Sequence, residues 1–170
     1  MMFLMLQGRK PNPAQTRVLD ALLIASMEHG IAPPSMISRC YASYGTSIQA
    51  AVSAGINAFG DRMGGLGEQL AKAMVDCLAD IADGPPPDDA TLQDRAAKLV
   101  GEIMARGDRV PGYGIPLHGA DPRAPKVLEI AKQQGTFGLY GRFGDAIGAE
   151  LAKARGGRAA PMNLDGVSAV

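Results

Sequence analysis

Hydrophobic residues recur at helical spacing along most of this chain. They form four stripes in which apolar side chains follow one another at intervals that fit the period of an α-helix rather than the alternation of a strand. The stripes are Ile48, Val52, Ile56 and Phe59; Leu70, Met74, Leu78 and Ile81; Leu92, Leu99 and Ile103; and Leu139, Phe143, Ile147 and Leu151. The pattern predicts an all-α protein whose helices turn these stripes toward a core.

Clusters of glycine and proline mark where the predicted helices end. A helix is expected over about residues 14–29, and the richest proline cluster lies at residues 84–89. We therefore expect residues 1–83 to form the helices of a larger lobe and residues 84–89 to form a linker. Residues 90–158 are expected to form a small helical lobe with an active-site loop, and residues 159–170 a return segment.

Composition narrows the classes of partner. The chain has 170 residues, enough for one domain, and its 17 basic and 17 acidic residues cancel, so bulk charge indicates no nucleic-acid or membrane partner. Cys40 and Cys77 lack metal-ligand spacing and only two histidines accompany them, so we expect no metal site. We expect both cysteines to be reduced core residues of a cytoplasmic protein.

The first six residues, Met-Met-Phe-Leu-Met-Leu, are apolar. They lack a basic leader and are too few for a secretory core or a membrane span. We expect them to belong to a helix whose apolar side chains need burial, which a second subunit would provide.

Two glycine-rich segments are candidates for function. In residues 60–68, Asp61 and Arg62 precede a glycine pair at the head of a predicted helix, where an anion could bind or a neighbouring helix could pack closely. Residues 109–123 form a loop too rich in glycine and proline to be helical, and loops of this length in compact proteins are often functional. Gly138, Gly141 and Gly144 follow no strand, so we interpret their spacing as a helix-packing face.

Four motifs in this order resemble the citrate synthase superfamily, in particular short citryl-CoA lyase-like proteins and the citryl-CoA lyase module of ATP-citrate lyase. The resemblance runs from about Phe3 to the last residue. The motifs are Glu28-His-Gly30 with Pro33-Pro-Ser35; Gly60-Asp-Arg-Met-Gly-Gly65; Val110-Pro-Gly-Tyr-Gly114 with Asp121-Pro-Arg123; and Asn163-Leu-Asp-Gly166.

The resemblance implies an all-α homodimer with a larger and a small helical lobe, acting on a coenzyme A thioester and a keto acid. Asp165 matches the family's acid/base carboxylate and His29 the histidine that binds the keto-acid portion, so both are implied catalytic residues. Arg123 matches an arginine that pairs with a substrate carboxylate, a task for which a planar guanidinium is suited. Arg62 and His118 are further candidates for substrate binding.

The same resemblance implies where coenzyme A lies. The backbone from Val110 through Gly112, Tyr113 and Gly114 matches the segment against which CoA packs. The implied reaction is a retro-aldol cleavage that leaves an acyl-CoA enolate to be protonated.

Met63, Ile115 and Gly119 depart from the family, and Gly119 stands where the family often has a basic residue that helps hold CoA phosphates. Met63 stands where synthases carry the histidine that stabilises the enolate oxygen, and ATP-citrate lyase has an aromatic residue there, which favours a lyase over a synthase. Ile115 replaces a second histidine, and losing such a donor typically costs about 10²–10³ in rate. His118 is a possible substitute for it.

Three functions therefore stay open at the level of sequence. The first is a citryl-CoA lyase-like carbon–carbon lyase acting on a hydroxy-polycarboxyl thioester. The second is a catalytically inactive relative that serves as a dimeric binding or regulatory subunit, which the two missing histidines favour. The third is a condensing enzyme, which Met63 disfavours.

Overall fold

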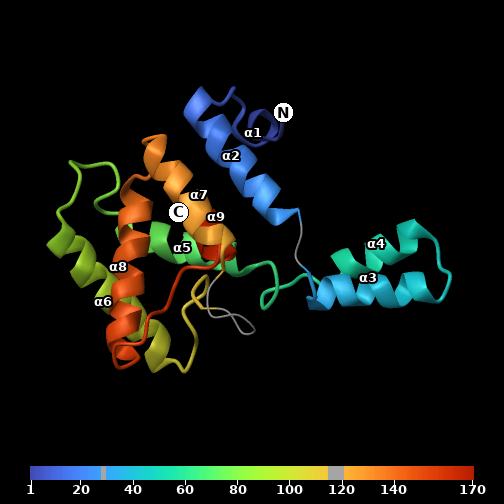
Figure 1. Ribbon diagram of the computed structural model, residues 1–170. Helices are drawn as coiled ribbons and strands as arrows, with labels where there is room; N and C mark the ends of the chain where they lie inside the picture. The colour runs from blue at the N-terminus through green and yellow to red at the C-terminus, as the bar shows by residue number, and fades with distance from the viewer. Residues whose placement is uncertain (28–29, 115–120) are drawn as a thin grey trace.

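The computed structural model describes residues 1–27, 30–114 and 121–170, and helices dominate these ranges (Figure 1). The helices are α1 (Met2–Gln7), α2 (Pro13–Ser26), α3 (Pro33–Ser43), α4 (Ile48–Ile56), α5 (Leu66–Leu78), α6 (Asp89–Ala105), α7 (Arg123–Gln133), α8 (Leu139–Ala154) and α9 (Leu164–Ala169). The described residues contain isolated backbone bridges but no extended strand, so the all-α prediction is confirmed.

Side-chain caps explain where several helices begin. At α2, the Asn12 side chain accepts the backbone N–H of Gln15, and the Gln15 side chain accepts the N–H of Asn12, while proline occupies the first helical position. Ser47, Asp88 and Asn163 accept a backbone N–H in the same way at the starts of α4, α6 and α9. Each cap satisfies a donor that the first turn leaves unpaired, so these starts are encoded locally.

The main core lies between α5, α6 and α8. Three of the four predicted stripes supply most of it, with Val110, Tyr113 and Ala160 added from loops. The largest fully buried side chains are Phe143, Leu70, Met74, Leu78, Leu92, Ile147 and Leu151. Helix α5 shares this core with helices that follow residues 84–89, while the division into lobes at that segment stays a prediction.

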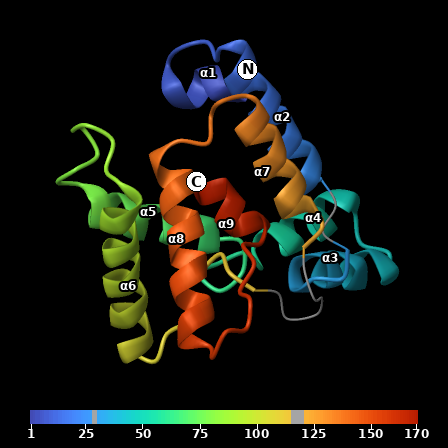
Figure 2. The ribbon, with the colours of Figure 1, turned by 60° about the vertical axis from the view of Figure 1, so that its left-hand side comes forward.

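A smaller core joins α2, α7 and α9. Ala124, Val127 and Val167 are buried there, with Leu22 and Ala25 of α2 packed against them. Figure 2 shows α2 beside α7, with α9 close to α7 and α8. Met162, in the segment before α9, packs against both cores, so this segment links the two groups of helices.

Helices α3 and α4 form a hairpin that stands apart from the other helices (Figure 1). They approach closely at Gly55, where an added Cβ would meet the Ser38 hydroxyl. The expectation that their apolar stripe faces a core is wrong, because Ile48, Val52, Ile56 and Phe59 are all more than half exposed. Cys40 on α3 is also exposed and therefore not a core residue.

The physical reason is that each helix of this hairpin packs mainly on the other, which leaves their outer faces without a covering element. Most apolar side chains of α1 are likewise exposed, with Met5 79% and Leu6 76% accessible, while Phe3 is partly buried. Along the ranges that the structure describes, every helix is too short or too polar to cross a membrane.

Candidate active site

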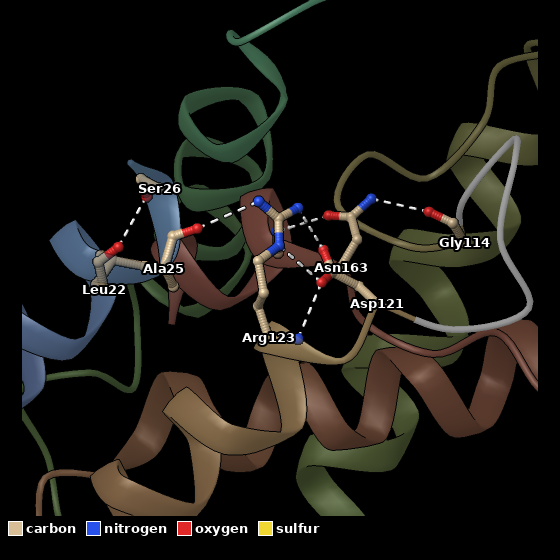
Figure 3. Close-up of polar contacts among 8 residues, drawn as sticks. Leu22, Ala25, Ser26, Gly114, Asp121, Arg123 and Asn163 are labelled. Atoms are coloured by element: carbon tan, nitrogen blue, oxygen red, sulfur yellow. Dashed lines mark hydrogen bonds and ion pairs between the residues drawn. The ribbon is translucent and has the colours of Figure 1, made fainter. Parts of the chain in front are cut away.

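The loop at residues 110–114 lies against the segment that leads into α9. The Gly114 N–H donates to the Pro161 carbonyl at 2.8 Å, and the Asn163 N–H donates to the Gly112 carbonyl at 3.0 Å. The Asn163 side chain also donates from Nδ2 to the Gly114 carbonyl at 2.9 Å (Figure 3). Two loops that are about 50 residues apart in sequence are thus held together by three hydrogen bonds.

Two glycines allow this approach. Gly112 has φ of 78°, and a Cβ on it would lie 2.7 Å from the Gly166 Cα. A Cβ on Gly166 would in turn meet the Gly112 carbonyl oxygen. Because backbone faces backbone here, neither position has room for a side chain, and Gly166 immediately follows Asp165.

Tyr113 anchors the loop to the core. Its hydroxyl donates to the Gly144 carbonyl at 2.6 Å, and burial raises the pKa of the phenol, which keeps it protonated and donating. Val110 is buried as well. Gly112 is buried too, and its carbonyl and both backbone groups of Gly114 already bond the segment before α9, so a ligand at this loop would pack on its surface rather than hydrogen-bond these groups.

Gly144 forms part of the packing face expected on α8. A Cβ there would meet Met162 at 2.8 Å and Val170 at 2.9 Å, and Gly141 lies equally close to the ring of Phe137. Gly144 thus serves close packing, as interpreted, whereas Gly141 meets only the nearby Phe137 and an added Cβ at Gly138 would have no neighbour nearer than 3.9 Å. The close packing at Gly144 explains how α8 comes near the Tyr113 hydroxyl.

Arg123 begins α7 and is paired with Asp121. Its Nε and Nη2 donate to the two carboxylate oxygens at 2.9 and 2.8 Å, and its backbone N–H donates to Oδ1 at 3.0 Å (Figure 3). Asp121 is only 6% exposed. The hydrogen bonds from Arg123 hold the pKa of this carboxyl below its usual range, against the opposing effect of burial, so Asp121 stays charged.

The same guanidinium reaches α2. Arg123 Nη1 donates to the Ala25 carbonyl at 3.2 Å, four residues before the predicted site residue His29. Its pKa is raised, first by the hydrogen bonds to Asp121 and, among the weaker contributions, by the negative charge of Asp165. Helices α2, α7 and α9 contact one another, so Asp121, Arg123 and the first turn of α9, which carries Asp165, lie at one junction.

A groove of about 630 Å³ runs along this junction between α2 and α7. Arg123 lies on its wall together with two further cations, Arg17 and Lys126, and the acid Asp20. Its apolar lining comes from residues such as Ile24 and Val127. Arg123 is already paired with Asp121, and Lys126 with Glu129 at 2.8 Å, so a ligand that carries carboxylates would compete with these acids for the two cations.

The turn at residues 60–65 is built as a tight corner. The Gly60 N–H donates to the Met63 carbonyl at 2.8 Å, the Met63 N–H donates back at 2.9 Å, and Arg62 is exposed at the tip. Gly64 has φ of 87° and lies under the ring of Phe59. These contacts lie within the turn and with the adjacent Phe59, so anion binding and close helix packing both stay open as interpretations of this turn.

The helix that follows the turn reaches the site. At Gly67, in the first turn of α5, a Cβ would lie 2.9 Å from the Asp165 carbonyl oxygen. Met63 lines a pocket of about 250 Å³ whose other walls are mainly apolar and include Ile56 and Phe59. The position at which synthases carry a histidine therefore has an apolar setting here.

Three positions predicted to matter, His29, Ile115 and His118, lie outside the described residues. Within the described ranges no group of three metal-ligating side chains occurs.

Sequence reasoning did not single out Asp121 as the partner of Arg123 or Asn163 as a link between loops. The spacing Asp-Pro-Arg and the capping pattern from Asn163 to Gly166 were the available signals.

The family comparison covers the whole chain. The family model described as citrate synthase, C-terminal domain, matches residues 1–170. Among solved structures, a citryl-CoA lyase from Hydrogenobacter thermophilus matches with a TM-score of 0.80 and 27% identity. That match covers 99% of this chain and 61% of the lyase chain.

Curated relatives are similar over most of this chain. A protein named putative citrate synthase 2 from Mycobacterium tuberculosis is 26% identical over 164 residues, which is 95% of this chain and 41% of the relative. The peroxisomal citrate synthase 1 of Arabidopsis thaliana is 28% identical over 145 residues, 81% of this chain and 27% of the relative. The chain thus spans less than half the length of these relatives.

Proposed function

The chain belongs to the citrate synthase family, and from that premise we propose that it is a carbon–carbon lyase that cleaves a coenzyme A thioester of a hydroxy-polycarboxylic acid. The observation that carries the proposal is the match of nearly the whole chain to a citryl-CoA lyase, over the same helices that form the site. The products are an acyl-CoA and a keto acid, and the proposed location is the cytoplasm.

The proposed reaction is a retro-aldol cleavage. The hydroxyl of the substrate passes its proton to solvent, its carbon becomes the carbonyl of the keto acid, and the carbon–carbon bond next to it breaks. The electron pair of that bond moves onto the thioester as an enolate. A proton delivered to the α-carbon then gives the acyl-CoA, so the reaction needs no oxidant or reductant.

We assign the delivery of this last proton to Asp165. Asp165 lies in the first turn of α9, directly after the segment that is hydrogen-bonded to the 110–114 loop. The thioester would lie against the backbone of that loop. A carboxyl so placed can transfer a proton to a carbon held within reach. Arg123 and the cationic groove beside it would hold substrate carboxylates, and His29 would bind the keto-acid portion.

Met63 separates this chain from the synthases, and it supports a lyase only through the resemblance to ATP-citrate lyase, which also lacks a histidine at this position. Condensation must generate the thioester enolate from the unactivated acyl-CoA, which a hydrogen-bond donor at the enolate oxygen assists. A methionine thioether donates no hydrogen bond, and this one lies among apolar residues. Cleavage passes through the same enolate, so in either direction position 63 would supply no side-chain donor to its oxygen.

We further propose that the chain acts as a homodimer through the α3–α4 hairpin. A two-helix hairpin with apolar side chains on its outer faces is marginal alone, and a second copy would cover Ile48, Val52 and Ile56 at once.

Sedimentation of the purified protein at micromolar concentration should show a dimer, and Val52→Glu should shift it to the monomer. Glu at Ala97, an exposed position on α6, is the control. A wild-type monomer would contradict this proposal.

The function is tested by incubating the purified protein with a panel of hydroxyacyl-CoA thioesters that includes citryl-CoA. Mass spectrometry should detect an acyl-CoA product, such as acetyl-CoA from citryl-CoA, formed in proportion to protein.

Free CoA should raise the melting temperature of the protein as the CoA concentration rises, as a ligand specific for the folded state must. Binding of CoA without cleavage of any thioester would favour the inactive binding subunit instead.

A further inference from the structure

Asn163 makes three contacts that meet at one point of the site. Its side-chain Oδ1 accepts the N–H of Gly166 at 3.1 Å and so caps α9, while its Nδ2 donates to the Gly114 carbonyl at 2.9 Å (Figure 3). Its backbone N–H donates to the Gly112 carbonyl at 3.0 Å. One side chain therefore bonds both the helix that carries Asp165 and the loop at 110–114.

The surrounding geometry leaves this link little freedom. The Gly114 N–H is already bonded to the Pro161 carbonyl, and Gly112 and Gly166 are in backbone contact. The Asn163 amide lies between these fixed points, with its donor and its acceptor directed at opposite partners. An amide supplies both groups at once, which a hydroxyl or a carboxylate of similar size cannot do in this geometry.

The contact of α9 with the start of α7 also depends on where α9 lies along its axis. Asp121 and Arg123 lie at the start of α7, which contacts α9. The hydrogen bonds from Arg123 are the main cause of the lowered pKa of Asp121, and the Leu164 backbone adds to it. A shift of α9 along its axis would change the distance of Asp165 from both the loop and Arg123. The position of α9 therefore sets the position of the carboxyl relative to both halves of a substrate.

From these contacts we propose that Asn163 is a positioning residue that couples the 110–114 loop to the first turn of α9. This inference rests on the proposed function, because it assigns the thioester to the loop and proton delivery to Asp165. Asn163 itself does not touch the reacting atoms. Its role is to keep the α-carbon of a bound thioester and the carboxyl of Asp165 in one register, where small displacements are costly.

Two substitutions separate capping from coupling. Asn163→Ser keeps a good helix cap but is too short to reach the Gly114 carbonyl. Asn163→Asp keeps the capping oxygen and the size of the side chain, but it places a carboxylate oxygen against that carbonyl in place of the donor. The matched control is Asn12→Ser, because Asn12 caps α2 and is exposed.

The readouts are steady-state kinetics and amide hydrogen exchange. Both Asn163 variants should lower kcat by about 10- to 100-fold, with KM for the thioester changed by less than about threefold. Exchange should rise together in residues 112–114 and 164–167. Asn12→Ser should leave kcat and the exchange of both segments unchanged.

An unchanged kcat in both variants, or exchange that rises in α9 alone, would overturn the coupling and leave Asn163 as a cap. If wild-type protein cleaves no thioester, the proposed function fails first. The exchange comparison needs no activity, so in that case a joint rise in both segments still supports the coupling and its absence still overturns it.

Discussion

Replacing Asp165 by asparagine is expected to lower the rate of thioester cleavage by about 10²–10⁴-fold, the usual contribution of a positioned acid or base. Asparagine has nearly the same size but cannot deliver a proton to carbon. Folding should survive, because α9 keeps its Asn163 cap and its buried residue Val167. Initial rates with citryl-CoA and a thermal melt of each protein measure the two effects.

Asp89→Asn is the matched control for this substitution. Asp89 is also an acid in the first turn of a helix, α6, but its side chain is 92% exposed and pairs with Arg142. This control should retain wild-type turnover. If Asp165→Asn turns over as fast as the control does, Asp165 takes no part in the chemistry.

The second large effect is expected for Gly112→Ala. A left-handed φ costs a non-glycine residue about 1–2 kcal/mol, and overpacking adds about 1–3 kcal/mol. The new Cβ would lie 2.7 Å from the Gly166 Cα and 2.8 Å from a methyl of Leu70, and the backbone atom cannot rotate away. We therefore expect the free energy of unfolding to fall by about 2–5 kcal/mol, as measured by urea denaturation.

Gly107→Ala isolates the packing contribution. Gly107 has φ of 79°, almost the same as Gly112, but nothing lies within 4 Å of its added Cβ. This control should cost only the backbone strain, about 1–2 kcal/mol. Equal losses for the two variants would show that the loop and α9 are not in the close contact described above.

The sequence predicted the helical fold well because most of the apolar stripes are used as their period suggests. Leu70, Met74 and Leu78 face the main core, as do Phe143 and Ile147. The α3–α4 stripe was misassigned to a core, because periodicity reveals an amphipathic helix but not which surface covers it. None of the other described helices covers the apolar residues of the hairpin.

The candidate site was predicted less completely. The motifs pointed to Arg123, Asp165 and the 110–114 loop, and these do lie in one region of the fold. The contacts of Asn163 with the 110–114 loop could not be read from sequence, since they join segments distant in the chain, and the Asp121–Arg123 pair depends on side-chain rotamers. A hydrogen bond between residues 49 positions apart has no local signal.

Cleavage of citryl-CoA in D₂O tests the central claim most directly. If this chain breaks the carbon–carbon bond and Asp165 protonates the resulting enolate, wild-type protein will release acetyl-CoA that carries one solvent deuterium, as measured by mass spectrometry. The Asp165→Asn protein will release far less in the same time. Absence of acetyl-CoA with the wild type, or equal amounts of labelled product from both proteins, would contradict the account.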